Sequence, residues 1–142
     1  MPYNPESQKT KDFFQRLKDR SLTPEAALKD LHNHYKKKAK RRGYTWNLNL
    51  EDCRRLIAQN CSYCGSSPNR IHKNKYGGEI LYNGIDRKDN SLGYEIGNVV
   101  PCCKFCNFAK HKHSMEEFQA WLDDIAAYYP TLLAKELSKE QP

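Results

Sequence analysis

The sequence contains no apolar run that approaches the 18 residues needed to cross a bilayer, which excludes a membrane-spanning protein. Its first residues lack the basic stretch and following apolar stretch of a secretory signal, so we expect a cytoplasmic protein that is not secreted. Internal repeats and low-complexity segments are also absent. With 142 residues, of which 38% are hydrophobic, the chain has the size and apolar content of one soluble globular domain.

Negative charge is scarce at the start of the chain. Residues 1–45 carry a net charge of +7, whereas residues 46–142 are neutral as a whole. Within this second part, residues 46–113 are positive and residues 114–142 are acidic. The positive field over the front and middle of the chain would attract a polyanion.

Capping residues and apolar periodicity predict helices towards both ends of the chain, with glycine-rich irregular sequence between them. Thr23 and Pro24 begin a helix that should end at Gly43, and Ser114 opens a last helix that Pro130 should stop. The predicted helices cover residues 6–20, 24–43, 50–59, 104–111 and 114–130, and the predicted strands cover residues 79–86 and 97–101. This mixture predicts an α+β fold.

Six cysteines in a cytoplasmic chain favour metal ligands over disulfides, because the cytoplasm keeps thiols reduced. Four of them form two Cys-x-x-Cys pairs separated by 38 residues: Cys61, Cys64, Cys103 and Cys106. Two such pairs complete the tetrahedral four-sulfur shell of one structural zinc ion, whose removal should unfold the loop-rich middle. A dithiol redox motif is the weaker alternative, since no βαβ pattern surrounds either pair.

Two cysteines remain outside these pairs. Cys53 lies on the expected inner face of a helix and is predicted to be a small core residue. Cys102 is an alternative ligand to Cys103, because Cys102-x-x-x-Cys106 also has a spacing that can reach one ion. The shared two-residue spacing favours Cys103.

Two oxygen-bearing residues occur close to the cysteines in the predicted elements. Asp86 ends a predicted strand, and Asn107 lies in the first turn of the helix that carries the second cysteine pair. Hard oxygen donors of this kind hold Mg²⁺ while leaving several positions to water or phosphate. Asp86 and Asp89 also fit an ordinary turn. A zinc-stabilised hairpin packed on a helix would instead bring Asp86 and Asn107 together at a metal site.

Four motifs then follow in order: Cys-x-x-Cys-Gly, Ile-Asp-Arg-x-Asp-Asn-x-x-Gly-Tyr, Gly-Asn-Val-Val-Pro-x-Cys-x-x-Cys-Asn-x-x-Lys and Ser-Met-Glu-Glu-Phe. Over residues 61–118 this order resembles the zinc-containing HNH endonucleases, particularly the kind frequent in phage genomes. The resemblance implies a ββα-metal fold, and cleavage of DNA phosphodiesters with Mg²⁺ or Mn²⁺, in a bacterial or phage-encoded protein.

The resemblance also implies roles for four residues. Asp86 stands at the position of the metal-binding acid, and Asn107 stands at that of a second metal ligand. Asn98 matches the middle asparagine, which fixes the loop between strand and helix by hydrogen bonds. Lys110 matches a helix lysine that is expected to contact a phosphate.

Arg87 departs from the family pattern, in which a histidine base usually follows the acid. An arginine stays protonated at pH 7 and cannot be that base, although some family members share the Asp-Arg pairing. Its alternative role is to clamp the scissile phosphate. The residues left as candidate bases are Asp89, His72, His111, His113, Tyr82 and Tyr94.

Six of seven consecutive residues at the end of the second predicted helix are cations: Lys36, Lys37, Lys38, Lys40, Arg41 and Arg42. They are either a solvated helix end or a DNA-binding surface, and the nuclease-like core favours DNA binding. Such contacts follow the phosphate backbone and carry no sequence information.

One domain with three parts is therefore predicted: a basic helical arm over residues 1–50, a zinc-stabilised HNH-like ββα-metal core over 51–118, and a C-terminal helix and tail over 119–142 packed on the core. The expected function is a metal-dependent endonuclease acting on double-stranded DNA. A monomer would nick one strand, and a homodimer would cut both. The alternatives are a nucleic-acid-binding module that has lost catalysis through Arg87, and a zinc adaptor that binds an acidic protein.

Overall fold

The computed structural model describes residues 8–139; residues 1–7 and 140–142, at the ends of the predicted arm and tail, lie outside this range. The elements are α1 (Gln8–Ser21), α2 (Pro24–Arg41), α3 (Leu50–Ile57), β1 (Arg70–Lys73), β2 (Glu79–Tyr82), β3 (Gly84–Arg87), β4 (Val99–Cys102), α4 (Lys104–Lys110) and α5 (Met115–Lys139). Small antiparallel sheets combined with helices confirm the α+β class. Between residues 8 and 139 no helix is long and apolar enough to cross a membrane.

The helix ends fall close to their local sequence signals. Thr23 caps α2 by accepting a hydrogen bond from a backbone N–H in its first turn, and Pro24 is the first helical residue. Gly43 follows the last turn of α2 with a φ of 78°, a left-handed conformation that glycine adopts without strain. Capping boxes at Asn49 and Ser114 open α3 and α5.

The strand predicted over residues 79–86 is two strands that belong to different sheets. β2 pairs with β1, which was not predicted, and β3 pairs with β4. Asn83 separates β2 from β3 because its backbone N–H donates to the Ile57 carbonyl and its side-chain amide donates to the carbonyls of Gln59 and Ser66. These partners lie outside the strand, and the single-strand prediction was therefore wrong.

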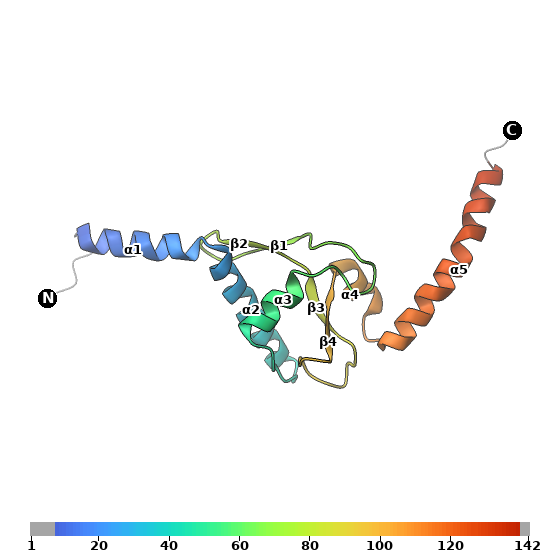
Figure 1. The fold of residues 1–142 in the computed structure, drawn as a ribbon, viewed down its shortest axis with the longest axis horizontal. Helices are drawn as coiled ribbons and strands as arrows, with labels where there is room; N and C mark the ends of the chain where they lie inside the picture. The colour runs from blue at the N-terminus through green and yellow to red at the C-terminus, as the bar shows by residue number, and fades with distance from the viewer. Residues whose placement is uncertain (1–7, 140–142) are drawn as a thin grey trace.

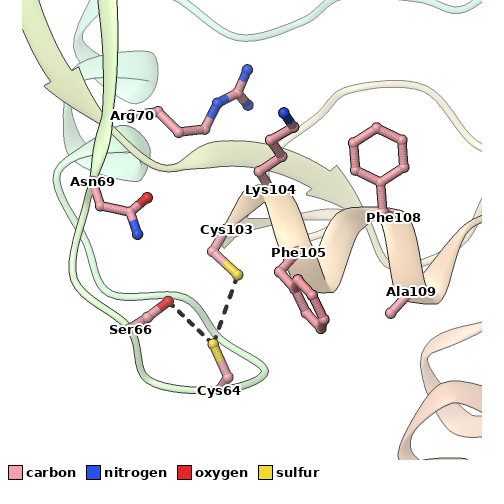
Figure 2. A pocket seen from close by; sticks show the side chains of 9 residues that line it. All are labelled: Cys64, Ser66, Asn69, Arg70, Cys103, Lys104, Phe105, Phe108 and Ala109. Atoms are coloured by element: carbon pink, nitrogen blue, oxygen red, sulfur yellow. Dashed lines mark hydrogen bonds between the residues drawn. The ribbon is translucent and has the colours of Figure 1, made fainter.

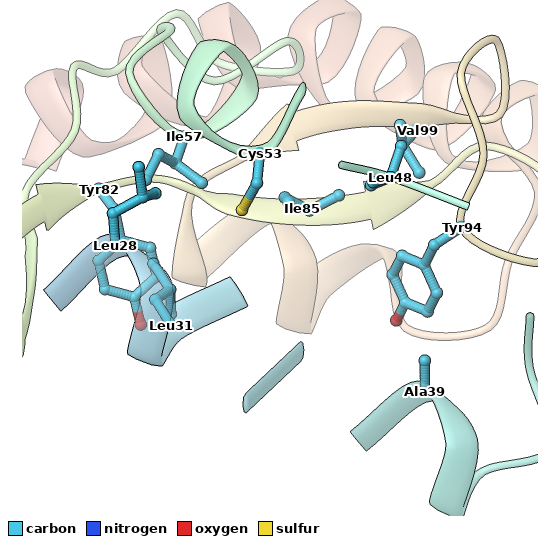
Figure 3. Packing of buried hydrophobic residues seen from close by; sticks show 10 residues of the cluster. All are labelled: Leu28, Leu31, Ala39, Leu48, Cys53, Ile57, Tyr82, Ile85, Tyr94 and Val99. Atoms are coloured by element: carbon cyan, nitrogen blue, oxygen red, sulfur yellow. The ribbon is translucent and has the colours of Figure 1, made fainter. Parts of the chain in front are cut away.

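The main hydrophobic core lies between α2, α3 and the β3–β4 hairpin (Figure 3). Its buried residues are Leu28, Leu31, Ala39, Leu48, Cys53, Ile57, Tyr82, Ile85, Tyr94 and Val99. Cys53 is a core residue, as predicted, and burial raises the pKa of its thiol to about 11. The core therefore packs against one side of the β3–β4 hairpin, which carries Asp86.

The last helix differs from its prediction in length and in packing. α5 continues through Pro130 instead of ending there. A proline removes one helical hydrogen bond, and on an exposed helix water can satisfy the carbonyl that is freed. Phe118 is buried, but the later apolar residues Trp121, Ile125 and Tyr129 are 43–55% exposed. Beyond its first turn α5 projects from the centre of the molecule instead of packing on the core (Figure 1).

Candidate active site

The four paired cysteines come together at one point. The sulfur atoms of Cys61, Cys64, Cys103 and Cys106 all lie within 4.8 Å of one another. The Cys64 and Cys103 Sγ atoms are 3.7 Å apart, and a tetrahedral site with Zn–S bonds of about 2.3 Å separates its sulfurs by roughly 3.8 Å. The cluster therefore has the ligand type, number and spacing that a zinc ion requires.

The paired thiols differ in their surroundings. Cys103 is the N-cap of α4, so the second pair is built into the start of that helix. Hydrogen bonds, above all the one with the Ser66 hydroxyl 3.1 Å away, lower the pKa of Cys64 to about 6, whereas burial raises the pKa of Cys106. The Cys102 thiol is fully buried and donates to the Cys103 carbonyl, and burial raises its pKa as well. This geometry places Cys103 in the cluster and Cys102 outside it.

Asp86 lies on β3 at the centre of a small buried network. Its Oδ2 accepts a hydrogen bond from the Tyr63 hydroxyl at 2.8 Å and pairs with the Lys110 ammonium at 3.1 Å. The Lys110 side chain has no exposed surface, and its Nζ also donates to the Arg87 carbonyl at 2.9 Å. Lys110 therefore neutralises and orients Asp86, and its burial is at odds with the phosphate contact that the resemblance implies.

Tyr63 is the site residue that sequence analysis missed. It occupies a variable position of the first cysteine pair, and burial together with its hydrogen bond to Asp86 raises its pKa. Its ring also meets Phe118 edge-on, with the ring centroids 5.1 Å apart. In the sequence, Tyr63 is marked only as an aromatic residue inside a Cys-x-x-Cys turn. That pattern does not predict its hydrogen bond to Asp86, which is 23 residues further along the chain.

Asn107 lies in α4, the short helix that packs against β3. It precedes Lys110 by one helical turn, so the two residues share a face of the helix. Unlike Lys110, Asn107 is exposed. Mg²⁺ in proteins is commonly held by only one or two protein oxygen atoms and keeps several water ligands. A carboxylate and a side-chain amide can supply those two oxygen atoms. The donor chemistry of Asp86 and Asn107 thus fits a divalent ion.

Asn98 holds the loop between β3 and β4. Its side-chain oxygen accepts from the Asp89 N–H, and its amide donates to the carbonyls of Asp89 and Gly93, all at 2.9–3.0 Å. These are loop hydrogen bonds of the kind that the resemblance implies. Asn98 therefore fixes the conformation of this loop.

The Arg87 side chain is directed into the same loop, between β3 and β4. Its guanidinium donates to the carbonyls of Asn90 and Leu92 at 2.9 and 2.7 Å. It also lies 3.5 Å from the centre of the Tyr44 ring and is 8% exposed. The Nη1 atom and one ring contact of the guanidinium therefore serve the fold, which is at odds with the phosphate-clamp hypothesis.

The candidate bases are dispersed over the molecule. His72 pairs with Asp30 of α2 at 2.8 Å, and Asp89 accepts from both the backbone and the hydroxyl of Ser91. Tyr82 and Tyr94 are buried in the core. His111 and His113, which directly follow α4, are exposed. Of the contacts described between residues 8 and 139, none joins any of the six candidates to the Asp86 carboxylate.

The basic end of α2 is open to solvent. Five of its six cations, Lys36, Lys37, Lys40, Arg41 and Arg42, are exposed, and Lys38 is half-buried. Burial and the neighbouring Arg42 and Arg41 lower the pKa of Lys38. Within residues 8–139 none of the six forms an ion pair with a carboxylate. Unpaired cations gathered on one helix end present an uncompensated positive surface.

Comparison with known proteins places this geometry in context, although no family model matches the chain. The chain is 33% identical over 100 residues to uncharacterized protein R423 of Acanthamoeba polyphaga mimivirus, covering 70% of this chain and 17% of that protein. It is 28% identical over 74 residues to the Bacillus subtilis (strain 168) protein named "SPbeta prophage-derived putative HNH endonuclease YoqL", covering 51% of this chain and 32% of that one. The chain thus spans less than a third of either relative.

A solved structure also matches the chain. The rare-cutting HNH restriction endonuclease PacI superimposes with a TM-score of 0.50 and 23% identity, over 70% of this chain and 77% of that one. This likeness shows a common fold.

Proposed function

The chain has the HNH fold, and on that premise we propose that it is a metal-dependent DNA endonuclease that hydrolyses phosphodiester bonds. The observation that carries the proposal is the buried Asp86 carboxylate, held by Tyr63 and Lys110 against a helix that begins at the cysteine cluster and exposes Asn107. The core over residues 51–118 would carry the chemistry, and the basic arm over residues 1–50 would bind the substrate.

In this proposal the four-cysteine cluster holds one structural zinc ion, which fixes α4 beside β3. Asp86 and Asn107 would hold Mg²⁺ or Mn²⁺. When bound, that ion polarises the phosphate and stabilises the leaving oxygen. Lys110 and Tyr63 act as positioning residues, because both contact the Asp86 oxygen Oδ2 and are themselves fixed by packing.

The attacking water requires a base, and Arg87 is unsuited to that role because an arginine is a poor proton acceptor and its Nη1 donates to two backbone carbonyls. His111 and His113 are the candidates that combine exposure with a position next to α4. A neutral imidazole nitrogen can accept a proton from water. We assign the base to this pair of histidines.

The basic end of α2 would contact the phosphate backbone of duplex DNA. One active site cleaves one strand, so a monomer is expected to nick and a homodimer to cut both strands. Supercoiled plasmid incubated with Mg²⁺ or Mn²⁺ tests the function, with nicked circles as the product.

Two site variants and one control variant are compared with the parent in this assay. Asn107→Ala removes an exposed side chain and should abolish nicking without unfolding the protein, whereas Asn60→Ala, the same change at an exposed position between α3 and β1, should leave nicking intact. Asp86→Asn keeps the hydrogen-bond acceptor but removes the charge and should also be inactive. Equal nicking by all four proteins would rule out this site.

Arg87 favours a second candidate function, a zinc-stabilised nucleic-acid-binding module without catalysis. It occupies the position of the usual histidine base and has a structural role instead. This candidate predicts salt-sensitive DNA binding and no cleavage with any divalent ion.

A further inference from the structure

Two phenylalanines of α4 are the most exposed large hydrophobic side chains in the described part of the chain. Phe105 is 83% exposed and Phe108 is 72% exposed. They are three residues apart and therefore project from neighbouring positions on the helix. The helix itself is fixed by Cys103, Cys106 and Lys110, so these rings stand on a rigid support.

Both rings line a concavity that also contains Arg70 and Lys104 (Figure 2). The Lys104 ammonium lies 5.9 Å from the centre of the Phe108 ring. No carboxylate lines the concavity, and within residues 8–139 neither cation forms an ion pair. Exposed aromatic faces next to unpaired cations are complementary to a ligand that is both flat and anionic.

We propose that Phe105 and Phe108 form a stacking platform for unstacked nucleobases, one on each ring, because Figure 2 shows the two rings directed to different sides of α4. The phosphates that flank these bases would contact Arg70 and Lys104. Base stacking on aromatic rings beside a cationic groove is how proteins hold single-stranded nucleic acid. The assignment rests on the proposed function in one respect, which is that nucleic acid is the ligand.

The position of the platform gives it a consequence for the substrate. Asn107, the proposed metal ligand, belongs to the same short helix as the two phenylalanines but projects from a different face. A nucleotide stacked on either ring would therefore flank the bond that is cut. The preferred substrate is DNA with unpaired or locally unstacked nucleotides beside the cleavage site, and not a uniformly paired duplex.

Binding can be measured apart from cleavage, with zinc-loaded protein and no added Mg²⁺ or Mn²⁺. The probes are a fluorescein-labelled 20-nucleotide single strand, the matching duplex, and the same duplex with two central unpaired nucleotides. The test variant is Phe105→Leu/Phe108→Leu, which keeps apolar surface but removes the aromatic faces. Phe105→Trp/Phe108→Trp restores them. Ile71→Ala/Leu81→Ala removes two exposed apolar side chains from the β1–β2 hairpin as a control.

The leucine variant should bind the single strand and the interrupted duplex at least about tenfold more weakly, with less than threefold change for the paired duplex. The tryptophan variant and the hairpin control should match the parent. Unchanged binding of all three probes by the leucine variant, or equal loss for all three, would overturn the platform. Plasmid nicking is measured separately. If the parent nicks plasmid but the leucine variant binds all three probes normally, the platform proposal fails and the proposed nuclease function stands.

Discussion

At the level of single residues, the proposed site requires that the buried charge of Asp86 be compensated. A carboxylate that is 8% exposed is costly unless it is paired. Lys110 supplies the opposite charge from inside the fold, and Tyr63 supplies a hydrogen bond. The same contacts orient the carboxylate, so the proposed function would depend on the pair that stabilises the buried charge.

Lys110→Met should therefore destabilise the protein strongly. It removes the partner of a buried carboxylate, which typically lowers the free energy of unfolding by about 3–5 kcal/mol. The double variant Asp86→Asn/Lys110→Met removes both charges and should recover much of that loss. Urea unfolding of the zinc-loaded proteins measures both values.

Lys104→Met is the matched control for this experiment, because it makes the same change at an exposed position of the same helix. Its effect should stay within about 0.5 kcal/mol. Similar destabilisation by the Lys104 and Lys110 substitutions would contradict a specific Asp86–Lys110 pair.

At the scale of elements, α4 owes its position to the cysteine cluster. A helix of seven residues is too short to be stable alone. Its first residue follows Cys103, and it includes Cys106, so a bound metal ties its first turn to the turn at Cys61 and Cys64. In the proposed zinc-bound protein, the position of α4 beside β3 would therefore depend on the metal.

Zinc analysis tests this dependence. The purified parent should contain one zinc ion per chain, Cys103→Ala should contain much less, and the control Cys102→Ala should still contain one. Chelation of the parent should lower its helical circular dichroism, because structural zinc supplies folding free energy. Loss of zinc from the Cys102 variant with retention by the Cys103 variant would reverse the ligand assignment.

Elements whose signals are local could be predicted from the sequence, whereas those defined by distant contacts could not. The caps at Thr23, Asn49 and Ser114 each involve residues within three positions. The break at Asn83 depends instead on Gln59 and Ser66, so one strand was predicted in place of two.

In the candidate site, too, residues marked by local patterns could be predicted and those defined by distant contacts could not. Spacing was sufficient to predict the cysteine cluster, and the resemblance to HNH endonucleases pointed to Asp86 and Asn107. Contacts across the fold were needed to find Tyr63 and to see that Arg87 and Lys110 are engaged with other parts of the protein.

At the scale of the whole molecule, charge is divided between the two ends of the chain. Residues 1–45 carry a net charge of +7 and residues 114–142 are acidic. α1 and α5 extend from opposite sides of the centre (Figure 1). Sequence analysis could predict the charges, but not the direction of α5, because its apolar periodicity suggested a packed helix.

The basic end of α2 should determine how strongly salt weakens DNA binding. Lys36→Ala/Lys37→Ala/Lys40→Ala should reduce the slope of log K against log salt by up to about 0.9 per lost phosphate contact, or nearly 3 in total. Lys73→Ala/Lys75→Ala/Lys135→Ala removes the same charge from other surfaces and should change the slope much less. Titrations of a labelled duplex at several NaCl concentrations measure it, and equal slopes for both triple variants would refute this binding surface.

The most direct test of the central claim is the initial rate at which the parent and Asn107→Ala convert supercoiled plasmid to nicked circles in saturating Mg²⁺. Asn107 is exposed, so its loss should leave folding, zinc content and DNA binding unchanged while lowering the rate by on the order of a hundredfold. A parent that does not nick, or a variant that nicks as fast as the parent, would contradict the assignment of an active site to Asp86 and Asn107.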